Sequence, residues 1–147
     1  MHIRKATLQD LDIITPLFDG YRQFYRQASN LEGASVFLKE RLTNKESTIF
    51  IAFYDREETE AVGFTQLYPL FSSVSMEQMM LLNDLYISPA HRGKGIGTLL
   101  INSAKELCLS LKQKGIVLQT ETTNPAQQLY ERLGFNKDPD LHYFWAR

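Results

Sequence analysis

The sequence predicts one α/β or α+β domain built on a single sheet with helices beside it. Segments with helical spacing of apolar residues alternate with short segments rich in β-branched and aromatic residues. No internal repeat or linker divides the 147 residues, so residues 1–147 are expected to form one domain. A chain of this length buries enough surface to fold without disulfides or a structural metal.

The first two expected elements are helices. Thr7 and Asp10 resemble a capping box with Asp in place of Glu or Gln, and the helical spacing that follows predicts a helix from about Leu8 to Gln27. Ser29-Asn30 and Gly33 predict a break after it. Apolar residues from Val36 to Leu42 then predict a second, shorter helix.

Three strands are expected next. Thr48–Tyr54 and Ala61–Tyr68 are rich in β-branched and aromatic residues, and the charged run between them predicts a hairpin. Pro69 marks an edge or loop, because proline cannot donate to a strand ladder. A longer strand is expected from about Glu77 to Ile87, ended by Ser88-Pro89.

The C-terminal third combines helices with short strands. Apolar residues recur at every third or fourth position from Ile96 to Leu111, which predicts a helix. Ile116–Thr120 is expected to be a short buried strand. Asn124-Pro125 opens another helix, and Gly134 occupies the position where a helix commonly ends in the left-handed region. Leu141–Trp145 is expected to form a final strand.

Composition excludes several classes of partner. Sixteen Lys and Arg residues against 17 Asp and Glu leave a net charge of -1, without the broad positive field that nonspecific nucleic-acid binding needs. No apolar stretch approaches the ~18 residues of a membrane span, and the first residues lack the apolar run of a secretory signal. The single cysteine, Cys108, has no partner for an internal disulfide, which predicts a reducing cytoplasm. The histidines show no metal-ligand spacing with it, so no metal site is expected.

One segment carries a chemical signal, where the predicted strand ending at Ile87 leads through a Gly-rich turn into a helix. Gly93, Gly95 and Gly97 lack the Cβ atoms that would hinder close approach to the backbone. The amides lie at a helix N-terminus, which favours phosphate, and Arg92 adds positive charge together with Lys94. The segment is therefore interpreted as a phosphate cradle. The competing interpretation is a tight turn that needs glycine for its geometry alone.

The spacing of the glycines distinguishes between the possible phosphate-containing ligands. The dinucleotide pattern G-x-G-x-x-G fails, because its last position falls on Thr98 or Leu100. The P-loop pattern fails because Gly95 stands where Ser or Thr must follow Gly93-Lys94. The pattern present, Arg92-x-x-Gly95-x-Gly97, resembles the acyl-CoA-binding signature of the GNAT superfamily of N-acetyltransferases.

Downstream residues extend this resemblance. Asn124-Pro125-Ala126-x-x-Leu129-Tyr130-Glu131-x-Leu133-Gly134-Phe135 looks like the second motif of the family, in which the Asn contacts the coenzyme arm and the Tyr points at the thioester sulfur. Ile3–Asp10 is similar to the family's first strand and helix. The resemblance implies a mixed, mostly antiparallel central sheet flanked by helices, the GNAT acyl-CoA N-acyltransferase fold. A weaker similarity points to the branch with histone and polyamine acetyltransferases.

The resemblance also implies the ligands. Acetyl-CoA would be the acyl donor, with its pyrophosphate over the turn amides, and a primary amine would be the acceptor. A homodimer is one possible assembly. Gly95 and Gly97 are expected to lie outside the core, so that a side chain there would obstruct the coenzyme alone. The expected coenzyme-binding residues are Leu85, Tyr86, Ile87, Arg92, Gly93, Lys94, Gly95, Ile96, Gly97, Thr98 and Asn124.

Acetyl transfer requires a neutral amine, although a free alkyl amine titrates near ~10.4. Asp84 is a carboxylate in an apolar strand, and period-two alternation puts it on the face of Leu82 and Tyr86. It marks either a site that binds or deprotonates the amine or a structural ion pair. Asn83 faces the other way unless a bulge intervenes. Glu121 is the second candidate base.

Tyr130 is the other expected catalytic residue. By family analogy its hydroxyl supplies a proton to the leaving thiolate, although its helical spacing is also compatible with a core residue. The leading hypothesis is an acetyl-CoA-dependent N-acetyltransferase. The alternatives are a catalytically silent acyl-CoA-binding regulatory domain and, disfavoured by both failed patterns, a nucleotide-binding module. The acceptor is expected to lie among residues 21–40, 68–76 and 142–147.

Overall fold

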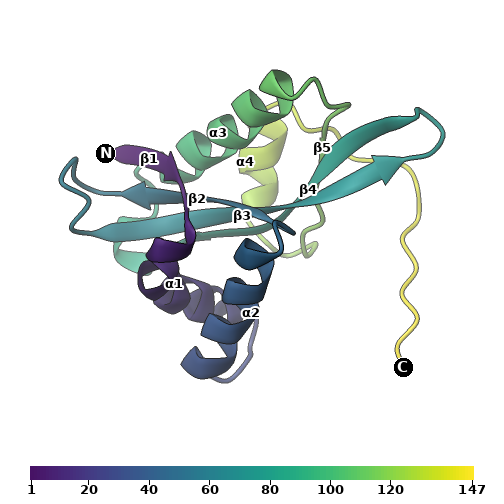
Figure 1. The fold of residues 1–147 in the computed structure, drawn as a ribbon. Coiled ribbons are helices and arrows are strands. Elements are labelled where there is room, and N and C mark those ends of the chain that lie inside the picture. Colours follow the sequence, from purple (N-terminus) through teal and green to yellow (C-terminus); the bar gives the residue numbers. More distant parts are fainter.

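The computed structural model describes residues 1–147 and contains the expected mixed sheet with helices on both faces (Figure 1). Five strands lie in the order β1-β2-β3-β4-β5, and every neighbouring pair is antiparallel except β4 and β5. The elements are β1 (His2–Lys5), the short 3-10 helix η1 (Leu8–Asp10), α1 (Leu11–Phe24), α2 (Leu31–Thr43), β2 (Thr48–Phe53), β3 (Ala61–Ser72), β4 (Glu77–Ile87), η2 (Pro89–His91), α3 (Ile96–Ser110), β5 (Ile116–Val117) and α4 (Ala126–Arg132).

The sheet separates two apolar layers. Helices α1 and α2 cover one face, where Ile14 and Leu38 pack on Ile51 and Phe64 of the sheet. On the other face, α3 and α4 pack against a layer that contains Leu67, Met80, Leu82, Ile101, Ala104, Cys108 and Tyr130. Cys108 is a buried free thiol. Both faces of the central strands are therefore apolar, as expected for a sheet covered on both sides.

The N-terminal helices differ from their predicted bounds for local reasons. The first predicted helix begins as η1 and ends at Phe24, shortly before Arg26 takes a left-handed conformation with φ 68°. The predicted break between the helices is confirmed at Ser29-Asn30, but Gly33 lies inside α2 rather than in the break. Asn30 caps α2, because its side-chain oxygen accepts a hydrogen bond from the Gly33 backbone N–H at 2.9 Å.

The central strands follow the prediction closely, and the β2–β3 hairpin is confirmed. Strand β3 runs through Pro69 to Ser72, further than expected. Its pairing with β2 stops at Leu67, opposite Thr48, so Pro69 has a neighbouring strand only on the β4 side. Proline is tolerated at such an edge position.

The predicted C-terminal strands are mostly wrong. Only Ile116–Val117 of the expected strand Ile116–Thr120 pairs with β4. Leu141–Trp145 forms no strand and runs away from the body as an extended segment (Figure 1). Between them, α4 forms as predicted, and Gly134 has the expected left-handed conformation with φ 87°. None of the helices is long and apolar enough to cross a membrane.

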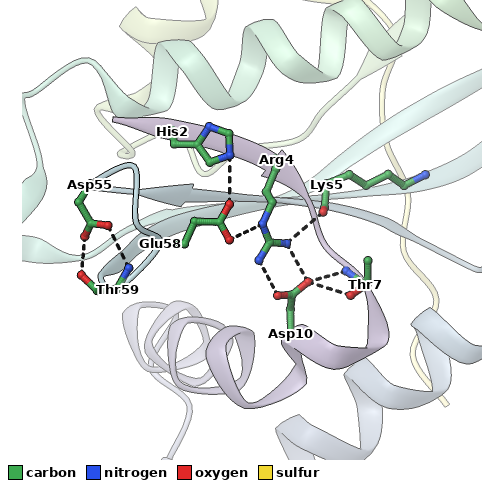
Figure 2. A network of polar contacts seen from close by, with 8 residues as sticks. All are labelled: His2, Arg4, Lys5, Thr7, Asp10, Asp55, Glu58 and Thr59. Atoms are coloured by element: carbon green, nitrogen blue, oxygen red, sulfur yellow. Dashed lines mark hydrogen bonds and ion pairs between the residues drawn. The ribbon is translucent and has the colours of Figure 1, made fainter.

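A polar network ties β1 to η1 and to the β2–β3 connection (Figure 2). Arg4 donates two hydrogen bonds to the Asp10 carboxylate, at 2.9 and 2.7 Å, and a third to Glu58 at 2.7 Å. Asp10 also accepts from the Thr7 backbone N–H at 2.7 Å, which confirms the predicted capping box. The Arg4 guanidinium, with the bonds from Thr7, lowers the pKa of the buried Asp10 carboxyl to about 2.

We expect Asp10→Asn to lower the free energy of unfolding by about 2 kcal/mol at pH 7. The folded-state pKa lies below the unfolded value, so the ionised carboxylate stabilises the fold above pH ~4 and this contribution is lost as the pH falls towards 2. Urea denaturation of both proteins over this range measures the difference, which should vanish at the acid end. Asp12→Asn, at an exposed position in the first turn of α1, is the matched control and should cost less than about 1 kcal/mol. An equal loss in both variants would contradict the assignment.

Candidate active site

A cleft opens in the sheet because β4 and β5 separate. The two strands pair only at Met80 with Ile116 and at Leu81 with Val117. From residue 82 to the end of β4, no strand lies on that side, so this stretch of backbone is an open sheet edge. The cleft lies between this edge and the chain that follows β5.

Three adjacent hollows occupy the cleft. A central cavity of about 200 Å³ shares Ile87, Arg92 and Leu129 with a turn hollow of about 360 Å³ beside the Gly-rich turn. At its other end the central cavity shares Tyr21, Tyr25, Leu82, Asn83 and Gln119 with an outer hollow of about 370 Å³. The predicted residues that line the central cavity are Leu85, Tyr86, Ile87, Arg92, Asn124 and Tyr130.

The Gly-rich turn has the geometry of an anion site. Gly93 and Gly95 take left-handed conformations, with φ 74° and 81°, and a Cβ atom at either would meet nothing within 4 Å. The turn therefore needs glycine for its backbone and is open to a ligand. It leads into the N-terminus of the 15-residue helix α3, where Ile96 and Thr98 also line the turn hollow.

The positive charge at the turn differs from the prediction. Arg92 and Arg132 line the turn hollow, whereas Lys94 does not, because its ammonium lies over the Tyr54 ring at 5.3 Å from the centroid. Sequence reasoning missed Arg132. Arg132 follows Leu129 by three residues in the predicted helix, so both side chains lie on one face. This spacing was the feature of the sequence that could have indicated Arg132.

Gly97 has a packing role. It is buried, and a Cβ atom there would lie 3.0 Å from Leu129 Cδ2. The expectation that Gly97 lies outside the core is therefore wrong, because α3 and α4 approach each other closely at this residue.

Arg92 lies at the junction of the turn hollow and the central cavity. Its Nε donates to the Ile87 carbonyl at 3.1 Å, and its guanidinium lies over the rings of Phe24 and Tyr86, 5.4 and 5.9 Å from their centroids. These contacts fix the guanidinium while leaving donors for an anionic ligand.

Tyr130 combines packing with exposure to the central cavity. Its ring packs edge-on against Phe135 and among apolar residues of the α3 side, and 9% of the residue remains exposed. The hydroxyl makes no hydrogen bond to another protein group. Burial raises the pKa of Tyr130 to about 12, so the hydroxyl keeps its proton at neutral pH and is able to donate it.

Asn124 links two elements across the cleft. Its side-chain oxygen accepts from the Ala126 backbone N–H at 2.9 Å at the start of α4. Its amide nitrogen donates to the Tyr25 hydroxyl on the α1 side at 3.3 Å and has a second hydrogen available for a ligand.

Asp84 lies beneath the cleft rather than on its wall. It is 1% exposed, and its carboxylate accepts hydrogen bonds from Gln66 at 2.5 Å and from Asn83 at 2.6 Å. Burial raises the pKa of Asp84, although the hydrogen bonds from Asn83 and Gln66 and the nearby Tyr21 hydroxyl oppose this rise.

A bulge determines where Asp84 points. Gln66 lies opposite Asp84 and Leu67 opposite Leu82, which leaves Asn83 as an extra residue in β4. The predicted shared face of Leu82 and Asp84 is therefore wrong: Leu82 packs on the α3 side, whereas Asp84 interacts with Tyr21 of α1. Because Asn83 is an extra residue, the side chains of Leu82 and Asp84 point to opposite faces of the sheet.

The outer hollow carries the second candidate base. Glu121 lines it and accepts a hydrogen bond from Arg26 at 2.6 Å. Tyr21, from the region expected to surround the acceptor, also lines it and donates to the Asn83 carbonyl at 3.1 Å. The other two expected acceptor regions, residues 68–76 and 142–147, contribute no residue to any of the three hollows.

Comparison with known proteins agrees with this geometry. Residues 14–135 match the model of the acetyltransferase (GNAT) family. The chain is 50% identical over 145 residues to the N-acetyltransferase YhfO of Bacillus subtilis strain 168, covering 97% of this chain and 95% of the relative. It is 31% identical to a probable acetyltransferase of Haemophilus influenzae, over 98% and 96% of the two chains. A crystal structure of a probable acetyltransferase matches with a TM-score of 0.92 and 36% identity, covering 100% of this chain and 97% of the other. The chain therefore belongs to the GNAT family of acetyltransferases.

Proposed function

We propose that this acetyltransferase moves the acetyl group of acetyl-CoA to a primary amine of a small molecule or peptide. The observation that carries the proposal is the sequence of three adjacent hollows that share lining residues, from the Gly-rich turn past Arg92 and Tyr130 to the outer hollow. A donor entering at the turn and an amine entering at the opposite end would meet near Tyr130. Bound acetyl-CoA would supply the activated thioester.

The residues at the turn fit the donor. A pyrophosphate would accept hydrogen bonds from backbone N–H groups at the start of α3 and would face the guanidinium groups of Arg92 and Arg132. The open edge of β4 over Leu85–Ile87 offers backbone groups to an extended, amide-containing arm and to the thioester oxygen. The second hydrogen of the Asn124 amide is available to the same arm.

We infer that the acceptor end removes the ammonium proton. Asp84 is the proposed base. Tyr21 would connect it to the outer hollow by turning its hydroxyl from the Asn83 carbonyl to the carboxylate, so that it takes the amine proton while passing its own to Asp84. Glu121, on the wall itself, is the alternative base. Tyr130 would donate its proton to the leaving thiolate, which agrees with its place in the lining of the central cavity and with its raised pKa.

The test of this function is thiol release from acetyl-CoA across a panel of small amines and peptides. Turnover with an amine, accompanied by the acetylated product, supports acetyl transfer. Tight acetyl-CoA binding without turnover on any amine would favour the acyl-CoA-binding regulatory domain.

We expect Gly95→Ala to weaken acetyl-CoA binding at least ~10-fold, because the added methyl group projects into the open approach to the turn amides. Calorimetric titration measures the affinity. Gly134→Ala is a matched control, since Gly134 also has a positive φ, 87°, and a Cβ atom added there would meet nothing within 4 Å. Both variants carry a similar backbone cost, but only the change at Gly95 should alter affinity. Unchanged binding by folded Gly95→Ala would remove the turn from the donor site.

Tyr130→Phe is expected to lower kcat about 100-fold while acetyl-CoA affinity and melting temperature change little. The substitution keeps the ring that packs against Phe135 and removes only a hydroxyl that has no protein partner. Steady-state kinetics with thermal denaturation separates the two roles. Unchanged turnover would leave Tyr130 with packing alone.

Asp84→Asn should reduce kcat/KM for the amine about 100-fold without altering acetyl-CoA affinity. Burial raises the pKa of Asp84, so in the parent enzyme kcat/KM should fall as the pH drops through a value above the usual ~4 of an aspartate. This acid limb should be absent from the pH profile of the variant. Glu121→Gln, measured in parallel, is expected to retain it. If Glu121→Gln abolishes the limb and Asp84→Asn mainly lowers stability, Glu121 is the base.

A further inference from the structure

Phe24, the last residue of helix α1, places an aromatic ring on the wall of the central cavity, where 46% of the residue is exposed. The packing of α1 on the sheet does not account for this ring, because other residues of the helix, such as Ile14 and Phe18, form the buried layer on that side. The ring instead faces Arg92, whose guanidinium carbon lies 5.4 Å from the ring centroid. Phe24 therefore contacts a charged group at the donor end of the cleft.

Arg92 is held in place without a carboxylate. Its contacts are the Phe24 ring, the Tyr86 ring at 5.9 Å and the Ile87 carbonyl, to which Nε donates at 3.1 Å. None of the ion pairs of the chain includes Arg92. Other arginines do pair with carboxylates, namely Arg4, Arg22, Arg26 and Arg41. The Arg92 guanidinium is thus positioned while its charge stays uncompensated.

This kind of support suits an anion site. A carboxylate beside a guanidinium would orient it, but it would also occupy N–H donors and offset the positive charge that an anionic ligand needs. The face of an aromatic ring attracts the same cation through the ring quadrupole and leaves the donors in the guanidinium plane free. Both terminal nitrogens of Arg92 therefore remain available to a pyrophosphate.

We propose that Phe24 is a positioning residue for the coenzyme, because its ring holds the Arg92 guanidinium at the junction of the turn hollow and the central cavity. This inference rests on the proposed function, in which the pyrophosphate faces Arg92. Tyr86 offers the second ring, but its hydroxyl also packs closely on α1, where a Cβ atom at Gly20 would lie 2.7 Å from it. Phe24 is therefore the support that can be changed without altering the packing of α1 on the sheet.

Calorimetric titration of acetyl-CoA into the members of a double-mutant cycle tests this role. Phe24→Leu keeps an apolar side chain but removes the ring, so it should weaken binding about 5-fold. Phe24→Tyr keeps a ring that attracts cations and should bind as the parent does. Arg92→Gln should weaken binding at least ~10-fold. Adding Phe24→Leu to Arg92→Gln should weaken binding by less than about 2-fold more, since Phe24 acts through Arg92.

Phe37→Leu is the matched control. Phe37 also has a guanidinium over its ring, that of Arg41 at 4.6 Å from the centroid, but it lies on α2 and lines none of the three hollows. Loss of this second pair should leave the affinity for acetyl-CoA unchanged. An effect seen at Phe24 and not at Phe37 belongs to the donor site.

The possible results separate this inference from the proposed function. If Arg92→Gln binds acetyl-CoA as tightly as the parent, the placement of the pyrophosphate is wrong and the role of Phe24 is lost with it. If Arg92→Gln weakens binding and Phe24→Leu does not, the donor site stands and Phe24 has no part in it. An equal loss from Phe24→Leu in both backgrounds would mean that the ring acts independently of Arg92, which also overturns the positioning role.

Discussion

Strand β5 pairs with β4 at only two positions, and the cleft depends on this short contact. A β5 that continued alongside β4 would occupy the edge from residue 82 to 87 with backbone hydrogen bonds. It would also close the space between Tyr130 and Asn83, which line the central cavity. The early separation of two parallel strands leaves the edge of β4 without a neighbouring strand, so side chains reach its carbonyls instead, Tyr21 at Asn83 and Arg92 at Ile87. The helices α1 and α4 form the remaining walls.

Burial is the common cause of the proton chemistry proposed for this cleft. It raises the pKa of Tyr130 and of Tyr21, which keeps both hydroxyls protonated at neutral pH, and it raises the pKa of Asp84, which makes that carboxylate more basic. One environment thus favours proton donors and a proton acceptor together. The near-zero net charge of the chain is compatible with this arrangement, because Arg92 and Arg132 supply positive charge locally at the turn hollow.

The parts of the site that sequence predicts well are those specified by neighbouring residues. The turn from Gly93 to Gly97 and the helix that carries Tyr130 follow from local glycine, proline and apolar spacing. The position of Asp84 could not be predicted, because the bulge at Asn83 arises from pairing with a distant strand. Arg132 and Tyr21 join the site through tertiary packing. Leu141–Trp145 has strand-forming residues, but a strand also needs a neighbour with which to pair.

The two ends of the cleft differ in stiffness. At the donor end, Gly97 lies against Leu129, so compression there would disturb the contact between α3 and α4. At the acceptor end, none of residues 118–125 is buried, and this wall is joined to α1 through the Glu121–Arg26 and Asn124–Tyr25 contacts. Displacing residues 119–125 breaks these side-chain contacts, whereas Leu118 packs against the core on the α3 side. The turn end of the cleft is therefore the more rigid of the two, whereas the outer end can adapt to molecules of different size.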